Sequence, residues 1–397
     1  SLGRVQTPIL AAISRRYRER ENHISSDSWP IYISLQKDGI LFKMRRTQDL
    51  PDKESATMFF QDCKLSHQAQ ITGISHSVKE ILPPDLLDLT QLQKEANIRY
   101  GFTASEVYDI AQSLYEKKLI SYPRTSSRYL TEDVFDSLSP IMARLLSWEL
   151  FPAAKGTGGI DISSLSRHVI SAEKANVHHA IIITGIRPGN LSEKEMQVYR
   201  LVAGRMLEAF MAPCRIETTN VEAVCAAQHF KAEQTRIIEA GWHDVFMRSD
   251  MIPTSGYSVK ELPEVEKGDT LNVCGCNMVH KKELPVDPFT DAELVEYMEQ
   301  NGLGTVSSRT NIIRTLVNRK YIRYSGKYIV PTPKGMFTYE TIRGKKIADT
   351  SLTADWEKQL TGLESGMITG QDFLNRIRTL AKEMTDDIFN TYSTKEE

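Results

Sequence analysis

The chain has 397 residues, of which 41% are hydrophobic, and this is enough for roughly two to four domains with buried cores. Its 49 Lys and Arg residues are balanced by 51 Asp and Glu residues, and this formal net charge of -2 excludes a protein that binds polyanions through bulk charge alone. No run approaches the roughly 20 apolar residues of a membrane span and no signal peptide is evident, so we expect a cytoplasmic protein without a membrane partner.

The cysteines are few and scattered. They are Cys63, Cys214, Cys225, Cys274 and Cys276. The one close pair, Cys274 and Cys276, lacks a second pair at metal-ligand spacing, so the sequence predicts a reducing compartment and no metal site. The chain begins at Ser1, without a methionine and inside a dense motif, which indicates an excised fragment or a processed chain.

The first 28 residues predict a helix whose N-terminus is suited to phosphate. Thr7 and Pro8 are favourable at the cap and the first position of a helix, and apolar residues follow at helical spacing. Arg4 and Gln6 therefore lie at the helix start, where free amide groups and the helix dipole attract anions. An ordinary helix start with a solvated arginine fits these residues equally well.

Residues 29–84 contain short β-rich runs, and two prolines mark the end of this segment. Helical texture then resumes, and a capping box at 103–106 opens a second helix. That helix ends in a basic pair, Lys117 and Lys118, directly before the run 119–130. A helix followed by an extended run is typical of helix-plus-wing units, many of which carry DNA.

The run 119–130 carries the candidate catalytic residues. Tyr122 precedes a proline, which favours an extended backbone, so we expect its ring to stand out from the end of a strand. Arg124 is two residues further on, and side chains at i and i+2 share a face of an extended chain, so phenol and guanidinium can converge on a phosphate. A fixed cation would also favour the nucleophilic phenolate. The same residues also fit a structural tyrosine beside a solvated arginine.

The middle of the chain gives weaker signals. The glycine-rich loop 155–159 lacks the Gly-Lys-Ser/Thr ending of a phosphate-binding P-loop, so we expect no use of ATP. His178 and His179 precede a run of apolar β-formers, where a histidine is either structural or functional. A capping box opens a helix at Ser192, and strand texture returns between 215 and 274. The order β, α, β predicts an α domain inserted into a β domain.

The last third of the chain is helical with one hairpin. A capped helix begins at 289–293, and the segment 302–309 leads into the next helix. A turn at Ser325 and Gly326 then marks a hairpin, which gives a second helix-plus-wing unit. The loop 304–308, rich in glycine and hydroxyl groups, fits either binding of backbone phosphate or a plain helix cap. Two further helices close the chain.

Six stretches together resemble the type IA DNA topoisomerases, most closely the bacterial topoisomerase III branch. They are residues 1–8, 89–97, 119–128, 178–184, 302–309 and 352–366. The third is similar to the family's active-site motif, Leu-Ile-Thr-Tyr-Pro-Arg-Thr-Asp-Ser-Arg. The six follow one another in the family's order along the whole chain.

The resemblance implies an α+β multidomain fold, the type IA topoisomerase torus core. In that fold a β arch domain carries an inserted, winged-helix-like α domain with the tyrosine, and a second α domain completes the torus around single-stranded DNA. The implied boundaries are 1–28 and 284–397 for the α DNA-binding domain, 29–84 and 219–283 for the β arch, and 85–218 for the tyrosine domain.

The resemblance also implies roles for individual residues. Tyr122 would attack a phosphodiester and keep the 5′ phosphate, without ATP, because the covalent bond conserves the energy for resealing. Arg124 would stabilise the developing charge, and His178 would hydrogen-bond the same phosphate. The residues expected along the DNA backbone are Arg4, Gln6, Thr125, Ser127, Thr305, Ser307, Ser308 and Arg309.

The chain departs from the family pattern at three motif positions and in one larger feature. Ser126 replaces an aspartate, which bears on the orientation of Arg124, while Ile183 and Val306 replace prolines, which we interpret as conformational adjustments. Family members also place before Ser1 a Toprim domain, whose Asp-x-Asp-x-Glu cluster holds Mg²⁺, and this chain has no Asp-x-Asp. We therefore expect a monomer that binds single-stranded DNA, holds no cofactor itself and does not relax supercoils alone.

Two other functions stay open. A non-catalytic single-stranded DNA-binding protein derived from the same fold would account for Ser126 and for the missing metal site. A tyrosine recombinase or phosphotransferase is not favoured, because the chain lacks several separated arginines around a C-terminal tyrosine. The topoisomerase interpretation places the protein in the bacterial cytoplasm, associated with the nucleoid.

Overall fold

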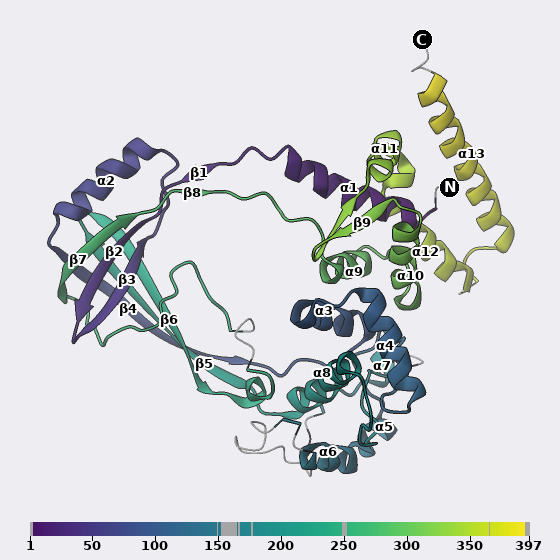
Figure 1. The fold of residues 1–397 in the computed structure, drawn as a ribbon, viewed down its shortest axis with the longest axis horizontal. Helices are drawn as coiled ribbons and strands as arrows, with labels where there is room; N and C mark the ends of the chain where they lie inside the picture. Colours follow the sequence, from purple (N-terminus) through teal and green to yellow (C-terminus); the bar gives the residue numbers. More distant parts are fainter. Residues whose placement is uncertain are drawn as a thin grey trace.

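Strands close into a barrel on one side of the molecule, and two helical regions complete a ring with it (Figure 1). The computed structural model describes residues 3–148, 150–151, 165, 167–175, 178–247, 252–364 and 366–393. The glycine-rich loop 155–159 lies outside the described residues. This arrangement confirms the predicted fold class, an α+β torus core.

The barrel consists of six antiparallel strands in the order β2, β3, β6, β5, β4, β7. Their bounds are β2 Ile31–Lys37, β3 Ile40–Arg46, β4 Gln68–Ile81, β5 Cys214–Cys225, β6 Gln228–Glu239 and β7 Thr270–Met278. Along β2, Ile31, Ile33 and Leu35 are buried while the residues between them face outward. This period of two places an apolar face inside the barrel, which closes where β3 pairs with β6 at Arg45 and Lys231 and at Arg46 and Phe230.

A helix, α2 (Lys53–Leu65), lies within the segment that the sequence predicts to be β-rich throughout, so that prediction is wrong here. Asp52 caps it by accepting a hydrogen bond from the Ser55 amide (2.7 Å). Only Ala56 and Cys63 of this helix are buried. Because so few of its residues face the barrel, the apolar period of 3.6 that reveals most helices is weak.

The first helical region is inserted between β4 and β5. These strands pair from Gln70 and Val224 to Ile81 and Cys214, so the chain leaves the barrel and returns at adjacent positions. The helices are α3 Leu89–Tyr100, α4 Ala104–Glu116, α5 Glu132–Asp136, α6 Leu138–Ser147, α7 Ala172–Ala175 and α8 Glu193–Phe210. Most of α8 is buried, which makes it the centre of this region. The predicted insertion is confirmed, and the expected boundary at 218 falls inside β5.

The second helical region joins the two ends of the chain. It contains α1 Gln6–Glu21, α9 Asp291–Gln300, α10 Val306–Asn318, the hairpin β9 Ile322–Ser325 and β10 Tyr328–Pro331, α11 Pro333–Ile342, η5 Lys346–Ala348, α12 Thr350–Glu364 and α13 Gly370–Ser393. Ile9, Leu10 and Ile13 of α1 share a core with α9, α10 and the hairpin. The first helix therefore depends for its burial on residues almost 300 positions away in sequence.

Two connections hold the ring together at the barrel. The short strands β1 (Asp27–Ser28) and β8 (Lys281–Lys282) pair and lead to the second helical region, as Figure 1 shows. On the other side, η3 (Gly241–Val245) anchors the inserted region, because the Trp242 indole donates to the carbonyl of Ile81 at the end of β4 (2.9 Å). No helix among the described residues combines the length and apolarity needed to cross a membrane.

Candidate active site around Tyr122

The end of α4 turns the chain toward Tyr122. Lys118 adopts a positive φ of 60°, and the Leu119 amide donates to the carbonyl of Leu114 (2.9 Å), so the helix stops sharply. Leu119 and Ile120 then bury their side chains in the core of the inserted region. The chain before Tyr122 is thereby anchored on apolar packing.

Tyr122 follows an isolated bridge rather than a regular strand, so the predicted strand end is wrong in that detail. Ile120 bridges Ile183, and the Ser121 amide donates to the carbonyl of Ile182 (2.8 Å). The Ser121 hydroxyl donates to the carbonyl of Ala180 (3.1 Å). These bonds tie the Tyr122 loop to the segment after the two histidines, which the sequence alone does not bring together.

Tyr122 is half-buried between two other rings. Its centroid lies 4.6 Å from the His178 ring, with the planes at 45°. Tyr115, near the end of α4, meets it edge-on at 5.5 Å and 78°. Within the described part of the chain the Tyr122 hydroxyl has no hydrogen-bond partner. The phenol is thus held by its ring while its oxygen stays available.

Arg124 lies along the same helix. Its Nη2 donates to Oε1 of Gln112 (3.2 Å), and its guanidinium lies 5.1 Å from the centroid of the Tyr108 ring. Its Nε is buried and has no partner among the described residues. Since Tyr108, Gln112 and Tyr115 recur at i, i+4 and i+7, they form one stripe of α4, and Tyr122 and Arg124 both rest on it.

Two of the predicted DNA-binding residues fix the loop from within. Thr125 and Ser127 are almost fully buried. The Thr125 hydroxyl donates to the carbonyl of His178 (2.8 Å), and the Ser127 hydroxyl donates to the carbonyl of Lys174 (2.7 Å). Both hydroxyls therefore connect the tyrosine loop to the histidine segment, and contact of either with DNA stays a prediction.

Arg128 links the tyrosine loop to both helical regions. Its Nε lies 2.7 Å from Oδ2 of Asp88, which caps α3, and its Nη2 lies 3.7 Å from Oε2 of Glu299 on α9. Burial raises the pKa of Asp88, although the Arg128 guanidinium opposes this. The loop thus adjoins the contact between α3 and α9 that closes the ring.

The predicted DNA-binding residues at the chain start lie in the second helical region. The helix begins at Gln6, before the predicted cap Thr7, whose hydroxyl accepts from the Gly3 amide (3.0 Å). Arg319, after α10, donates to Oε1 of Gln6 (3.1 Å), and the Arg4 guanidinium lies 5.5 Å from the Trp356 ring. These contacts with Arg319, after α10, and with Trp356 of α12 orient Gln6 and Arg4.

The start of α10 presents some of its predicted residues and buries one. Thr305 and Ser307 are exposed, and the Thr305 amide donates to the hydroxyl of Ser308 (2.8 Å). Arg309 is buried and donates from Nη1 to Thr90 of α3 (3.0 Å) and to Glu299 of α9 (3.1 Å). Its observed partners belong to the ring closure, so its contact with DNA stays a prediction.

A model of the family described as DNA topoisomerase matches residues 1–375. This chain belongs to the type IA DNA topoisomerases. It is 30% identical to DNA topoisomerase 3 of Bacillus licheniformis, over 98% of this chain and 56% of that protein. It is also 30% identical to DNA topoisomerase 3 of Bacillus subtilis, over 99% and 57% of the two chains, and to DNA topoisomerase 1 of Methanocaldococcus jannaschii, over 100% and 50%.

The fold of this topoisomerase chain is similar to that of full-length topoisomerase I from Thermotoga maritima. The TM-score is 0.74 at 24% identity, and the match covers 96% of this chain and 62% of that one. The chain spans about half the length of the curated relatives that it matches.

The departures from the family pattern have different local consequences. Ile183 is buried, and its amide, which a proline would lack, donates to the sulfur of Met206 (3.1 Å). Val306 occupies the first position of α10, where proline is also tolerated, and packs on the core of the inserted region. Ser126 is exposed, and the contacts of Arg124 within the described residues are with Gln112 and Tyr108 of α4.

The described residues of the topoisomerase chain contain no group of three or more His, Cys, Asp or Glu side chains arranged to hold a metal ion. Two carboxylates that adjoin the tyrosine loop, those of Asp88 and Glu299, are engaged with Arg128. This donor set does not fit Mg²⁺, which prefers several carboxylate and water oxygens in octahedral geometry.

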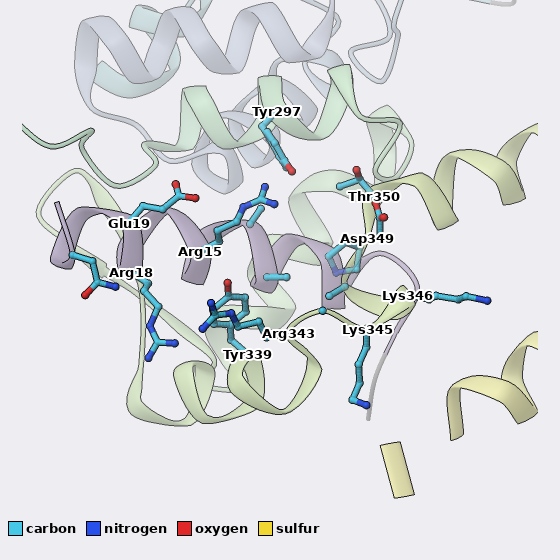
Figure 2. Close-up of a pocket in the computed structure, with 16 residues that line it drawn as sticks. Arg15, Arg18, Glu19, Tyr297, Tyr339, Arg343, Lys345, Lys346, Asp349 and Thr350 are labelled. Carbon is cyan, nitrogen blue, oxygen red and sulfur yellow. The ribbon is translucent and has the colours of Figure 1, made fainter. Parts of the chain in front are cut away.

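A basic pocket of about 860 Å³ lies apart from the tyrosine loop, between α1, α9, α11 and η5. Figure 2 shows Arg15 on the side of α1 that faces Tyr297, and Arg343 on the other side. Most of its cations are paired, since Arg343 lies 3.9 Å from Glu340 and Lys346 lies 3.5 Å from Glu383. We assign this pocket no part in the site.

Sequence analysis missed the α4 stripe of Tyr108, Gln112 and Tyr115. The Tyr115 ring is 39% exposed and faces Tyr122. The signal was present, because the three residues recur at i, i+4 and i+7 directly before the tyrosine motif.

Proposed function

We propose that this chain is the DNA-binding and nucleophile-bearing core of a type IA topoisomerase, which cuts one DNA strand, passes another through the break and reseals it without ATP. The observation that carries the proposal is the α4 stripe. It supports the Tyr122 ring and the Arg124 guanidinium on one surface, and among the residues that the structure describes neither the phenol oxygen nor the Arg124 Nε has a hydrogen-bond partner. A phosphodiester bound on this stripe would contact both the Tyr122 oxygen and the Arg124 Nε.

In the proposed cleavage, the Tyr122 oxygen attacks phosphorus and loses its proton. The bond between phosphorus and the 3′ oxygen breaks, the phosphate stays on Tyr122 and on the 5′ end, and the leaving 3′ oxygen takes up a proton. Resealing reverses these steps, so one phosphodiester is exchanged for another and no external energy is needed. Arg124 stabilises the charge on the non-bridging oxygens, and His178 donates a hydrogen bond to the same group.

The ring closure between α3 and α9 fits the strand-passage step of the proposal. Its polar contacts include the ion pair of Lys94 with Glu296 of α9 (2.6 Å), and Gln93 of α3 also bonds Thr310 of the adjoining α10 (2.9 Å). Polar groups released by opening can be hydrated, so this contact costs less to break than an apolar core would. The tyrosine region can then move with its covalently held DNA end.

We further propose single-stranded DNA as the substrate, with Arg4, Gln6, Thr305, Ser307 and Ser308 along its backbone. Mg²⁺ and the groups that move protons would come from residues outside 1–397, so this chain alone is expected to bind DNA as a monomer without relaxing supercoils. A nucleoid-associated location is proposed from the DNA substrate, and a bacterial one from the Bacillus relatives.

The test is covalent capture of a labelled single-stranded oligonucleotide by the complete protein with Mg²⁺. Wild type should give an adduct that survives denaturation, and Tyr122→Phe should abolish it while binding the oligonucleotide normally. Tyr115→Phe, the neighbouring ring, should still form the adduct. Adducts that persist in Tyr122→Phe would show that Tyr122 is not the nucleophile.

A non-catalytic single-stranded DNA-binding protein is the second candidate. Ser126, in place of the family's aspartate, favours it. Complete protein that binds single-stranded DNA but forms no adduct under any divalent cation would support this candidate over the first.

A further inference from the structure

A second basic and aromatic surface lies on the outside of the barrel. Tyr32 of β2 pairs across the sheet with Arg45 of β3, and Arg45 pairs with Lys231 of β6. Neighbours of these residues along the strands, namely Ile31, Ile33, Met44, Phe230 and Ala232, are buried inside the barrel. Because side chains alternate along a strand, this row points outward.

A segment after η3 borders this row. It lies alongside β6, because the Glu233 amide donates to the carbonyl of Tyr257 (2.9 Å) and the Val259 amide donates to the carbonyl of Glu233 (2.8 Å). The Tyr257 hydroxyl donates to the carbonyl of Thr47 (3.0 Å). A pocket of about 440 Å³ lies between this segment and the strands β2 and β3. We call this surface, with Tyr32, Lys43, Arg45, Lys231, Tyr257 and Lys260, the barrel outer site.

Its cations surround an aromatic ring. The Arg45 guanidinium and the Lys231 ammonium each lie 5.7 Å from the centroid of Tyr257. Arg45 also bonds Asp49 (2.6 Å) and the carbonyl of Gly256 (3.4 Å), and its Nε is buried without a partner in the described part of the protein. A Cβ at Gly256 would come within 2.5 Å of Arg45 Nη1, so glycine permits this approach.

Three lysines leave the barrel outer site with excess positive charge. Among the described residues Lys43, Lys231 and Lys260 have no ion-pair partner, and the first and last are exposed. Glu261 is the carboxylate that lines the same pocket. Tyrosine rings beside unpaired lysines suit a strand whose bases are free to stack, because a duplex hides its base faces.

We propose that the barrel outer site binds single-stranded DNA as a second site, with bases against Tyr257 and Tyr32 and phosphates against the lysines. Figure 1 shows the coloured part of the segment before β7, residues 252–269, on the side of the barrel that faces the inside of the ring. A strand held there lies on the side toward the tyrosine region. The choice of DNA as ligand rests on the proposed function.

Photo-crosslinking locates the bound strand. An oligonucleotide of about 30 nucleotides, with 5-iododeoxyuridine at every third position, is irradiated with the chain, and crosslinked peptides are identified by mass spectrometry. We expect crosslinks at Tyr257 or Tyr32 as well as near Tyr122. Crosslinks near Tyr122 alone would overturn the second site and leave the proposed function intact. Crosslinks at the barrel alone would support the second site and count against the proposed function. An absence of crosslinks would overturn both.

Charge reversal measures the contribution of the lysines. Lys43→Glu with Lys231→Glu should weaken binding of the same oligonucleotide roughly 10-fold and lower the slope of log affinity against log salt by about 1.4, at about 0.7 for each lost phosphate contact. The matched control is Lys64→Glu with Lys267→Glu, two exposed lysines of the barrel region outside this pocket. Equal losses in both pairs would show that general charge, rather than the barrel outer site, binds the strand. An acidic peptide that competes with the oligonucleotide at equal concentration would also contradict the choice of ligand.

Discussion

The rings of Tyr122 and His178 lie 4.6 Å apart with their planes at 45°, although 56 positions separate the two residues in sequence. The contact depends on Thr125, whose hydroxyl holds the His178 carbonyl (2.8 Å). If His178 bonds the phosphate under attack, His178→Ala in the complete protein should slow adduct formation roughly 100-fold, as loss of one such donor does elsewhere. DNA affinity should change little, because only one hydrogen-bond donor is lost. The adjacent His179→Ala is the matched control, and an equal effect of both would contradict a specific role for His178.

Arg124 should depend on its two partners from α4. Arg124→Lys keeps the charge, but an ammonium cannot lie flat over Tyr108 and reach Gln112 at once. We expect Arg124→Lys to lower the rate of adduct formation roughly 10- to 100-fold, and Gln112→Leu roughly 10-fold, with normal folding by circular dichroism. Asp109→Asn, on the same helix but paired with Arg314, should have no such effect. A wild-type rate in Gln112→Leu would show that this contact does not orient the guanidinium.

The ion pair of Lys94 with Glu296 should help to keep the ring closed. The pair is partly exposed, so its contribution should be about 0.5–1 kcal/mol rather than that of a buried pair. Lys94→Glu should speed amide hydrogen exchange in α3 and α9, because two carboxylates then face each other. The swap Lys94→Glu with Glu296→Lys should restore protection. If the swap exchanges as fast as Lys94→Glu, the pair does not act in closure.

Much of this architecture could be predicted from local sequence, whereas the site contacts could not. The capping boxes at Thr103, Ser192 and Thr290 lie where their sequence pattern places them, because each needs only residues three apart. The inserted domain was predictable from the order of β and α texture. The meeting of Tyr122 with His178 depends on long-range bonds of Ser121, which no local pattern encodes.

The structural features that the sequence analysis did not predict also depend on tertiary packing. Helix α2 buries only two residues, so its signal is weak, and Arg309 resembles a solvent-facing arginine until α3 and α9 enclose it. Thr125 and Ser127 belong to a motif associated with DNA, yet their hydroxyls serve backbone carbonyls. Whether a polar side chain faces a ligand or a neighbour is decided by tertiary packing, which residue type alone does not reveal.

Glu195 should make stability depend on acid pH. It accepts hydrogen bonds from Lys117 (2.6 Å) and Ser113 (2.7 Å) at the end of α4, and the Lys117 bond is the main reason that its pKa falls from 4.5 to about 2. Because the folded-state pKa is lowered, this stability is present above pH 4.5 and is lost as the pH falls toward 2. Glu195→Gln should therefore lower the free energy of unfolding at pH 7 by about 1–3 kcal/mol and flatten its decline across that window. Urea unfolding at several pH values measures both, with the exposed Glu193→Gln as control.

Arg205 should be the most sensitive charged residue of the inserted region. Its side chain is 8% exposed and bonds Glu95 (2.5 Å), Glu208 (2.9 Å) and the carbonyl of Asp85 (3.1 Å), which ties α8 to α3 and to the connection between β4 and α3. Arg205→Met would leave the Glu208 carboxylate buried without its cation, so we expect a loss of about 3–5 kcal/mol in the free energy of unfolding. Adding Glu208→Gln should recover part of this loss, because it removes the uncompensated charge. Arg200→Met, on the exposed side of the same helix, should cost less than about 1 kcal/mol. If Arg205→Met and Arg200→Met proved equally stable in urea, the buried charge network would not be what holds α8 in place.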